Sequence, residues 1–408
     1  MNCRFCGTNL CFTVIDLGTS PPSNAYLLRE DLHKAEQFYP LNILLCESCW
    51  LVQTQDFVKE DELFNSSYAY FSSYSKSWLL HVERYVDEII CRFNLGRESL
   101  VVEIASNDGY LLQYVQSAKI PCLGIEPTKS TAQSARQKHI ETVEDFFTEK
   151  LARTLSERGF RADLMVANNV LAHVPRINDF VSGFRILLKN HGVATFEFPH
   201  LKHLIVKKQF DTVYHEHFSY LSLGTVNQIF VANGLDIFDV QELSTHGGSL
   251  RVFAQRIDTG IQPKNARVQE ILKEEESVGI NTTAAYLNLQ ADAEMIKNEL
   301  VNFLIEAKRL KKNVVAYGAA AKGNTLLNFA GIRSDLVRYV VDKNLAKQGK
   351  FLPGSRLAIV DESRLLEDRP DYILILPWNL REEIIEQLQF VRQWGGRFVV
   401  AVPNLCII

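Results

Sequence analysis

The sequence of 408 residues predicts an α/β protein built in three parts. Two Cys-x-x-Cys pairs mark residues 1–64, strand-like and helix-like segments alternate over residues 65–261, and a shorter alternation follows within residues 262–408. A chain of this length exceeds what one hydrophobic core usually organises. We therefore predict a small N-terminal domain, a central α/β domain, and a helical linker leading into a C-terminal α/β domain.

The overall composition is that of a globular protein, with 47% hydrophobic and 23% charged residues. A formal net charge of -4 gives no electrostatic reason to bind nucleic acid. The sequence contains no apolar run near the roughly 20 residues that span a bilayer, and its start, MNCRFCGTNL, lacks the layout of a signal peptide. We expect a cytoplasmic protein with neither nucleic acid nor a membrane as partner.

The paired cysteines indicate a metal site. Cys3 and Cys6 are separated by two residues, as are Cys46 and Cys49, and this spacing lets two thiolates of one turn reach one tetrahedral ion. The alternative is a set of free, unrelated cysteines. Four thiolates leave no open ligand position, so we predict a structural zinc ion. The other cysteines follow no such pattern and are expected to be buried in packing: Cys11, Cys91, Cys122 and Cys406.

The segment LVVEIASNDGYLLQY predicts a buried strand ending at Glu103, a turn carrying Asn107, Asp108 and Gly109, and a helix from about Tyr110. Such a turn lies at the carboxyl edge of a parallel sheet, where α/β proteins bind nucleotide-type ligands. It is not the dinucleotide pattern G-x-G-x-x-G, because it carries a single glycine. Carboxylate and amide acceptors suit a ligand that carries an ammonium and a sulfonium.

The following strand, CLGIEP, ends in Glu126, 23 residues after Glu103. A carboxylate there accepts hydrogen bonds from both ribose hydroxyls, which fits adenosine in a methyltransferase or in a dehydrogenase. Alternatively, Glu126 is a solvated carboxylate at a strand end, and Asn107 and Asp108 are ordinary turn formers. Further strand-like segments, DLMVANN, GVATFEF and SLRVFAQR, complete a parallel-sheet pattern.

The segment FDTVYHEHFSYLS carries the densest chemistry, with Tyr214, His215, Glu216 and His217 in a row. In an extended chain the two histidines share one face, and Tyr214 and Glu216 share the other, whereas a turn would break this rule. A histidine can take a proton near neutral pH and a tyrosine can stabilise a carbonyl oxygen that gains charge. A metal site and a purely structural cluster remain alternatives, although H-E-H lacks the helical spacing of a zinc protease.

The remainder of the chain predicts linker helices and a second sheet. Charged segments with apolar residues at helical spacing occupy residues 262–311, and NVVAYG, VRYVVD, YILILP and RFVVAV follow between helical stretches. After NVVAYG, the small residues from Gly318 to Ala321 precede Lys322 and Asn324 at a predicted helix start. A helix N-terminus with a lysine favours an anion.

Taken together, these motifs resemble the S-adenosylmethionine (SAM)-dependent sugar C-methyltransferases of deoxysugar biosynthesis. The resemblance runs through the whole chain and includes the paired cysteines, LGTSPPSNAYL, E-x-x-x-N-D-G, NNVLAHVP, YHEHFSYLS, HGGSLRVF and VVAYGAAAKGNTLLN. It implies a zinc-binding domain, a central SAM-binding Rossmann-like domain, and a C-terminal Rossmann-like domain that helps to hold a nucleotide sugar.

The resemblance also implies roles for single residues. The expected reaction is methylation of carbon 3 of a nucleoside-diphospho-4-keto-6-deoxysugar, most often thymidine-linked, with His217 as the base and Tyr214 near the C4 oxygen. The other residues expected in the catalytic site are Glu216, His173 and Tyr68. The residues expected to bind SAM are Glu103, Asn107, Asp108, Gly109, Glu126 and Asn168. The residues expected to bind the nucleotide sugar, with the diphosphate at Lys322, are Gly318, Lys322, Asn324, Ser249 and Arg251. Ala105 stands where relatives often have glycine, which leaves the SAM loop more constrained.

Two other functions compete with this one. An NAD-dependent nucleotide-sugar reductase or epimerase would use the C-terminal α/β domain, yet neither strand-loop carries a complete dinucleotide pattern. A zinc-ribbon interaction or nucleic-acid module would need a basic face, and the acidic charge balance disfavours one.

Overall fold

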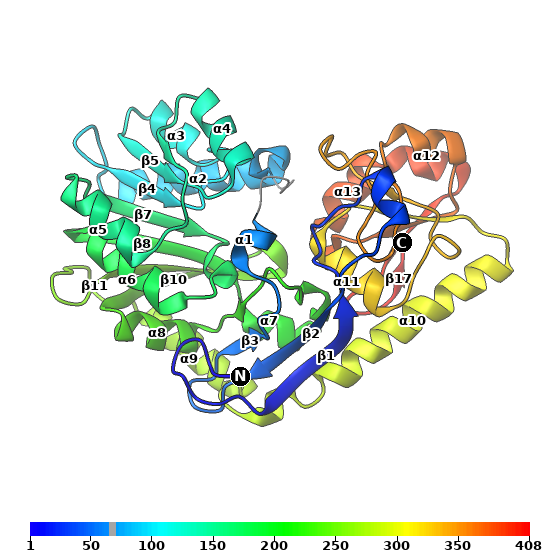
Figure 1. Ribbon diagram of the computed structural model, residues 1–408, viewed down its shortest axis with the longest axis horizontal. Coiled ribbons are helices and arrows are strands. Elements are labelled where there is room, and N and C mark those ends of the chain that lie inside the picture. Colours follow the sequence, from blue (N-terminus) through cyan, green and yellow to red (C-terminus); the bar gives the residue numbers. More distant parts are fainter. Residues whose placement is uncertain (65–70) are drawn as a thin grey trace.

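The computed structural model describes residues 1–64 and 71–408, and within these ranges the strands form three sheets (Figure 1). Figure 1 shows the central sheet at the left, the C-terminal sheet at the right, and the small N-terminal sheet between them at the lower edge. The three-part α/β architecture is confirmed. The boundaries after residues 64 and 261 stay predictions, and Tyr68 lies outside the described residues.

The small sheet is antiparallel, with strand order β1-β2-β3-β9. Its strands are β1 (Phe12–Ser20), β2 (Tyr39–Leu45), β3 (Val52–Thr54) and β9 (Ser219–Tyr220). The short helices of this region are η1 (Arg29–His33) and α1 (Glu60–Leu63). Since β9 belongs to the segment YHEHFSYLS, the N-terminal domain is hydrogen-bonded directly to the stretch that carries the predicted catalytic residues.

The central sheet has strand order β10-β11-β8-β7-β4-β5-β6. Its strands are β4 (Val101–Ile104), β5 (Cys122–Ile125), β6 (Thr142–Val143), β7 (Ala162–Asn168), β8 (Leu188–Pro199), β10 (Leu235–Leu243) and β11 (Ser249–Arg256). Five neighbouring strands of this sheet are parallel to one another: β8, β7, β4, β5 and β6. The prediction that SLRVFAQR joins them in parallel is wrong. This segment forms β11, which runs antiparallel to both of its neighbours, β8 and β10.

Helices cover both faces of the central sheet. They are α2 (Lys76–Arg92), α3 (Leu112–Ser117), α4 (Lys129–Gln137), α5 (Glu149–Glu157), α6 (Ile177–Leu187) and α8 (Leu223–Ala232). The short helix α7 (Leu201–Val206) packs instead into the core that the small sheet shares with α10 and the C-terminal sheet. The 3-10 turns are η2 (Ser72–Tyr74), η3 (Leu171–His173), η4 (Phe210–Thr212) and η5 (Thr245–Gly247). Val102 and Ile104 pack into the core on the side of α6, whereas Val101 packs on the side of α2, as alternation along a strand requires. Because the apolar side chains of the strands fill these two cores, the polar residues that follow the strands lie at the edge of the sheet.

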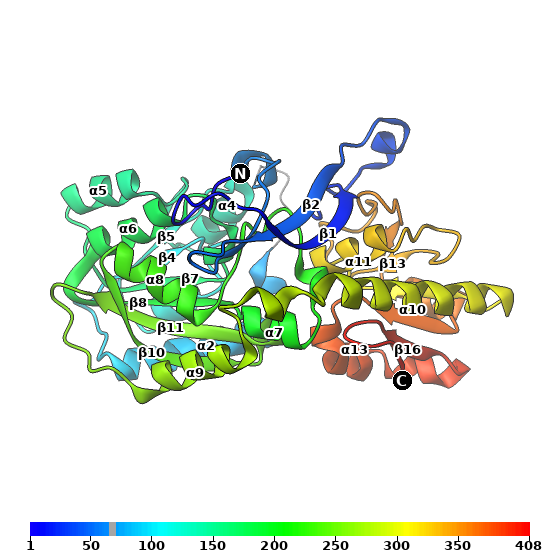
Figure 2. The same ribbon diagram turned by 90° about the horizontal axis from the view of Figure 1, so that it is seen from below.

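The predicted linker helices are confirmed as α9 (Ala266–Val278) and α10 (Leu289–Arg309), with η6 (Thr283–Tyr286) between them. Figure 2 shows α10 running past β1 and along the C-terminal unit. Its buried residues recur at helical spacing and share one core with β1, β2 and β12: Leu289, Ala293, Ile296, Leu300 and Leu304. This shared core joins the small sheet to the C-terminal domain.

The C-terminal sheet has strand order β14-β13-β12-β15-β16-β17, and all neighbours are parallel except the last pair. Its strands are β12 (Val314–Tyr317), β13 (Val340–Val341), β14 (Ile359–Val360), β15 (Tyr372–Ile375), β16 (Arg397–Val400) and β17 (Cys406–Ile407). Its helices are α11 (Ala321–Phe329), α12 (Ser363–Asp368), η7 (Trp378–Leu380), α13 (Arg381–Gln387) and η8 (Gln389–Trp394). The predicted second parallel unit is confirmed.

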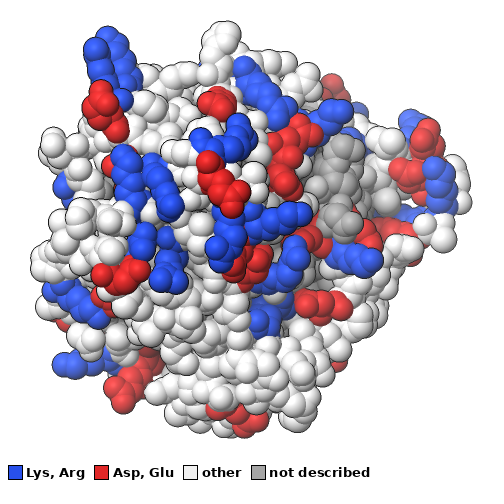
Figure 3. Space-filling view, turned by 60° about the vertical axis from the view of Figure 1, so that its left-hand side comes forward, with Lys and Arg blue, Asp and Glu red and all other residues white. Residues whose placement is uncertain are grey.

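The surface shown in Figure 3 carries basic and acidic side chains interspersed with each other. A face that binds nucleic acid usually gathers Lys and Arg over one area, and this face shows no such gathering. Among the described residues, no helix is both long enough and apolar enough to cross a bilayer.

Candidate active site and zinc site

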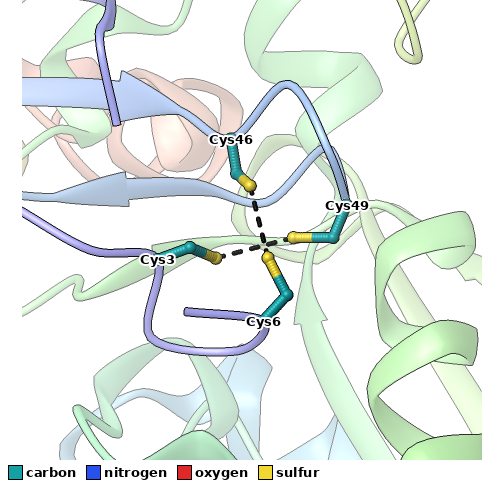
Figure 4. A group of neighbouring side chains, drawn as sticks. All are labelled: Cys3, Cys6, Cys46 and Cys49. Carbon is teal, nitrogen blue, oxygen red and sulfur yellow. Dashed lines mark hydrogen bonds between the residues drawn. The ribbon is translucent and has the colours of Figure 1, made fainter. Parts of the chain in front are cut away.

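The four paired cysteines converge on one point (Figure 4). The Sγ atoms of Cys3 and Cys49 lie 3.5 Å apart, as do those of Cys6 and Cys46, and all four lie within 4.8 Å of one another. Thiolates bound at about 2.3 Å to one tetrahedral zinc ion would be roughly 3.8 Å apart, so this group fits the ion.

The expectation for the other cysteines is largely wrong. Cys11, Cys91 and Cys406 are exposed and Cys122 is half-buried. They lie at the ends or on the outer faces of elements, and the exposed thiols therefore contribute little to the core.

A cleft of about 1900 Å³ lies between the central and C-terminal domains. Its lining includes the carboxyl ends of β4, β5 and β7, the segment from Thr212 to Tyr220, and residues of α11 and η7. Ligands of parallel α/β sheets bind outside the carboxyl ends of the strands. The cleft is therefore the place for both a nucleotide-type cofactor and a second substrate.

The loop after β4 is tightly turned, with positive φ at Ala105 (55°), Asn107 (48°) and Gly109 (74°). The backbone N–H of Asn107 donates to Oε2 of Glu126 at 2.9 Å, and the N–H of Thr128 donates to Oε1 at 2.9 Å. Oε1 also accepts from the hydroxyl of Thr131 at 3.0 Å, whereas Oε2 keeps a further lone pair. Glu126 is thus fixed in place and still able to accept from a ligand.

The six residues predicted to bind SAM fall into two sets of three. Asn107, Glu126 and Asn168 line the cleft. Both amide atoms of Asn168, at the end of β7, lack a hydrogen-bond partner among the described residues. A buried, unpaired amide beside a fixed carboxylate fits the donors and acceptors of an adenosyl cofactor.

The other three, Glu103, Asp108 and Gly109, lie behind the loop and do not line the cleft. Glu103 is completely buried, and this burial raises its pKa well above the ordinary value. Asp108 lies 3.6 Å from the ammonium of Lys138. A Cβ added to Gly109 would come within 2.4 Å of Cδ1 of Ile140, so glycine lets the loop pack closely against the chain before β6. In this structure these residues shape the loop.

The segment YHEH contains a turn, so the pairing of faces that an extended chain would give does not apply. The N–H of His217 donates to the carbonyl of Tyr214 at 2.9 Å, which brings the two side chains of these residues together. The Tyr214 hydroxyl lies 2.6 Å from Nε2 of His217, and the ring centroids are 3.9 Å apart. Nδ1 of His217 lies 2.9 Å from the carbonyl oxygen of Thr212. Because a carbonyl only accepts, Nδ1 carries the hydrogen and Nε2 is the basic nitrogen.

The electrostatic surroundings keep His217 neutral. Burial lowers its pKa well below the ordinary value, and the neighbouring His173 adds to this shift. The ring centroids of His173 and His217 are 4.8 Å apart, and burial lowers the pKa of His173 to about 4. Burial raises the pKa of Glu216 to about 7, opposed by the amide of Asn24, whose Nδ2 donates to Oε2 at 2.6 Å. Near pH 7 the cluster therefore contains two neutral imidazoles and a carboxyl group close to its titration point.

His215 points away from this cluster. Its Nε2 lies 3.1 Å from the carbonyl oxygen of Pro40, and its ring packs edge-on against Tyr39 at 6.0 Å. Of the two histidines in YHEH, one contacts the small sheet and the other lines the cleft.

Lys322 lies in the first turn of α11, as predicted, and lines the cleft. Its Nζ donates to Oδ1 of Asn379 at 2.7 Å and sits 4.4 Å from the ring centre of Trp378. Burial lowers the pKa of Lys322 to about 8, opposed by the charge of Asp211. Gly318 and Asn324 do not line the cleft, and Asn324 is completely buried.

Ser249 and Arg251 begin β11. Arg251 lines the cleft, but its Nη2 donates to Oε2 of Glu197 at 2.7 Å in a buried ion pair. Its guanidinium also lies 4.2 Å from the ring centre of Tyr85. Ser249 is buried, and its hydroxyl donates to the carbonyl of Thr245 at 3.0 Å. Of the donors of these two residues, Nε of Arg251 is buried without a hydrogen-bond partner among the described residues.

Sequence reasoning missed several residues that line the cleft. Asn24, which contacts Glu216, lies in LGTSPPSNAYL and gave no chemical signal of its own. His246 has φ 54°, its ring lies tilted against that of Trp78 with the centroids 5.3 Å apart, and both residues line the cleft. A histidine before two glycines, in HGGSLRVF, is the signal that could have singled out His246.

The fold and the cleft define a methyltransferase-type α/β domain with a four-cysteine domain before it and a second α/β domain after it. Three family models match these parts: "Putative zinc binding domain" over residues 3–64, "Methyltransferase domain" over residues 78–240, and "C-methyltransferase C-terminal domain" over residues 244–403. The class is therefore that of methyltransferases.

The relative that narrows this class is C-methyltransferase NovU of Streptomyces niveus, which is 34% identical over 406 residues, 100% of this chain and 96% of NovU. The chain belongs to the C-methyltransferase family. It is a SAM-dependent enzyme with a zinc-binding N-terminal domain, whose ligands are supplied by the four-cysteine group.

Solved structures are less similar. Magnesium protoporphyrin IX methyltransferase from Synechocystis PCC 6803, with bound SAH, is 19% identical and covers 44% of this chain and 83% of its own, with a TM-score of 0.35. The PH0226 protein from Pyrococcus horikoshii OT3 is 13% identical and covers 46% of this chain and 95% of its own, with a TM-score of 0.38. Similarity at this level carries no argument about the site.

Proposed function

We propose that this C-methyltransferase methylates carbon 3 of a nucleoside-diphospho-4-keto-6-deoxysugar, with thymidine as the nucleoside. The observation that carries the proposal is the pairing of a neutral His217 with the Tyr214 hydroxyl on the wall of the cleft. A base next to a hydroxyl donor is the equipment for removing a proton beside a ketone. The sequence resemblance to sugar C-methyltransferases supports the choice of substrate.

His217 acts as the base in the proposed mechanism. As the sugar enters, the Tyr214 hydroxyl turns from Nε2 of His217 to the C4 oxygen. The C3–H bond then breaks, its proton goes to Nε2, and its electron pair is delocalised onto the C4 oxygen, which the Tyr214 hydroxyl stabilises. The carbonyl of Thr212 holds the imidazolium through Nδ1. Carbon 3 is then nucleophilic.

SAM, when bound, supplies an electrophilic methyl group and accepts the electron pair of the broken carbon–sulfur bond. Glu126 is proposed to hold the ribose hydroxyls, and Asn107 and Asn168 the polar groups around them. Glu103, Asp108 and Gly109 keep the loop in shape from behind.

The residues around His217 complete the proposed site. Glu216 and His173 form its polar lining. The resemblance to sugar C-methyltransferases adds Tyr68, which lies outside the described residues. Lys322 is proposed to bind the diphosphate, because a charged donor near the start of α11 favours an anion. Gly318 and Asn324 shape that helix start, and Ser249 and Arg251 support the wall of the cleft.

The structure disfavours the reductase alternative at the loop after β12. A dinucleotide would place its phosphates against such a loop. There the carbonyl of Ala319 already accepts from the Tyr26 hydroxyl at 2.7 Å and from Nζ of Lys347 at 2.9 Å. These side chains cover the loop. A reducing compartment such as the cytoplasm suits the four thiolates, and we propose it as the location.

The test is mass spectrometry of the product after mixing the zinc-loaded protein, SAM and a thymidine-diphospho-4-keto-6-deoxysugar. The expected result is a product heavier by one methylene group, lost in His217→Asn while that variant still binds SAM. Product from both proteins would retain methyl transfer and reassign the base, with Tyr214→Phe as the next variant. A wild-type protein that binds SAM but forms no product would contradict this substrate.

A further inference from the structure

The zinc-binding domain places one arginine against both histidine-bearing segments of the active site. Arg4 lies between the ligands Cys3 and Cys6, but its side chain turns away from the sulfur atoms and is only 4% exposed. Nη1 donates to the carbonyl of Pro175 at 3.2 Å, and Nη2 donates to the carbonyl of Thr54 at 3.0 Å. A buried guanidinium is costly unless its hydrogen bonds are made, so these contacts define its position.

The carbonyl of Thr54 belongs to a residue that holds His217. The Oγ1 of Thr54 donates to the carbonyl of His217 at 2.9 Å, and the N–H of Thr54 donates to the carbonyl of Phe218 at 3.2 Å. The guanidinium carbon of Arg4 also lies 5.4 Å from the ring centre of Phe218. Arg4 therefore acts on the backbone of the base through Thr54 and also packs against the ring of the next residue, Phe218.

The carbonyl of Pro175 belongs to the segment that carries His173. Pro175 follows His173 by two residues, just after η3. The two imidazole rings lie 4.8 Å apart, and each comes from a segment that the arginine contacts. One planar guanidinium thus joins Pro175, in the segment of His173, to Thr54, which is hydrogen-bonded to the backbone of His217.

The zinc site restrains the backbone of Arg4 and the chain that leads into β3. The backbone N–H of Arg4 donates to Oε1 of Gln53, the residue before Thr54, at 3.0 Å. Cys49 precedes the same strand by three residues, and the hydroxyl of Thr225 donates to its carbonyl at 3.3 Å. Binding of the four thiolates to one ion would hold Arg4 in register with β3.

We propose that Arg4 is a positioning residue of the methyl-transfer reaction, which holds His217 at its working distance from His173 by clamping Thr54 and Pro175. This inference rests on the proposed role of His217 as the base. A lysine cannot replace Arg4, because one ammonium does not reproduce two N–H groups in a planar fork. A misplacement of the base by 1 Å lowers the rate of the chemical step by about 100-fold and leaves substrate binding largely intact.

The kinetic test compares Arg4→Met, Arg4→Lys, Thr54→Val and the control Asp56→Asn in the zinc-loaded, full-length protein. Asp56 is exposed and accepts from the same guanidinium at 2.9 Å, so the control removes an ion pair and keeps both carbonyl contacts. We expect Arg4→Met to lower kcat by about 100-fold, with KM values, SAM affinity and one zinc per chain unchanged. Thr54→Val should lower kcat by about 10-fold, and Asp56→Asn should match the wild type.

The base itself gives a further readout. Exchange of the C3 hydrogen with deuterium from solvent, in the absence of SAM, should slow in Arg4→Met as much as kcat does. In nuclear magnetic resonance spectra the imidazole signals of His173 and His217 should move, and those of the exposed His33 and His191 should not. This second measurement needs no substrate.

The outcomes separate this inference from the proposed function. Wild-type protein without product would overturn the substrate proposal, and the imidazole signals would still decide whether Arg4 positions His217. An active wild type whose Arg4→Met variant keeps its kcat, or loses zinc and SAM affinity together with kcat, would overturn the role of Arg4. Restored activity in Arg4→Lys would also contradict it, because charge alone would then suffice.

Discussion

The central and C-terminal α/β units share one local arrangement at the edge of their sheets, a carboxylate that accepts a hydrogen bond from a loop N–H. In the central unit, Glu126 accepts from the backbone N–H of Asn107 at 2.9 Å, across the loop after β4. In the C-terminal unit, Asp342 accepts from the N–H of Ala319 at 2.7 Å, across the loop after β12. Each carboxylate follows the neighbouring parallel strand and also accepts from an N–H two residues later. Both units therefore fix an acidic group beside a turn between a strand and a helix.

The two units differ in what covers this carboxylate and its loop. Glu126 opens onto the cleft beside the unpaired amide of Asn168. The Ala319 loop is covered by Tyr26 from the N-terminal domain and by Lys347, whose ammonium lies 3.6 Å from Asp342. The same turn geometry is therefore open to the cleft in one place and covered by side chains in the other. Function follows from access, not from the fold.

The largest expected effect is on the affinity for SAM, and it tests the difference in access between the two loops. Glu126→Gln should raise the Kd for SAM about 100-fold, which corresponds to about 2.7 kcal/mol, because the amide has no charge and replaces one acceptor oxygen by an NH2 donor. Asp342→Asn is the matched variant in the covered loop and should change the Kd less than twofold. Isothermal titration calorimetry measures both. Equal losses in both variants would mean that the two units are not distinguished by access.

The next effect concerns the charge that the C-terminal unit presents to the cleft. Lys322→Met should raise the KM for the nucleotide sugar about 10-fold and leave SAM affinity unchanged, since a charge-assisted hydrogen bond to phosphate contributes about 1.5 kcal/mol. Lys308→Met, at the exposed surface of α10, is the control.

The same lysine predicts a pH dependence. Burial lowers the pKa of Lys322 to about 8, so the side chain is charged below that pH and neutral above it. For the wild type, kcat/KM for the sugar should fall as pH rises through about 8, and this fall should be absent in Lys322→Met. A fall that persists in the variant would assign the titration to another group.

Local patterns in the sequence predicted the parts of the molecule that local physics determines. The spacing of Cys3, Cys6, Cys46 and Cys49 predicted a metal site because tetrahedral coordination restricts spacing. The strand before Asn107 was evident from its apolar residues. Both predictions concern neighbours along the chain or a requirement of the ligand.

Contacts between distant segments were not predictable in this way. Asn24 reaches Glu216 across 192 residues, and Arg251 meets Glu197 through an antiparallel pairing that the pattern did not reveal. The turn at YHEH was open to two readings, because a tyrosine and a histidine three residues apart meet in a turn and separate in a strand. Such side chains need the three-dimensional arrangement.

The smallest expected effect is on the free energy of unfolding, and it compares the backbone conformations of the two loops. Ala105 holds φ 55° in the open loop, and Gly318 holds φ 87° in the covered one. Because a left-handed conformation costs an L-residue about 1 kcal/mol, Ala105→Gly should stabilise the protein by about that amount. Gly318→Ala should destabilise it, since the new Cβ would lie 2.5 Å from Cδ of Pro377. Urea denaturation of both variants measures the opposite signs. A loss of stability in Ala105→Gly would show that the alanine side chain, which lines the cleft, contributes more by packing than its backbone conformation costs.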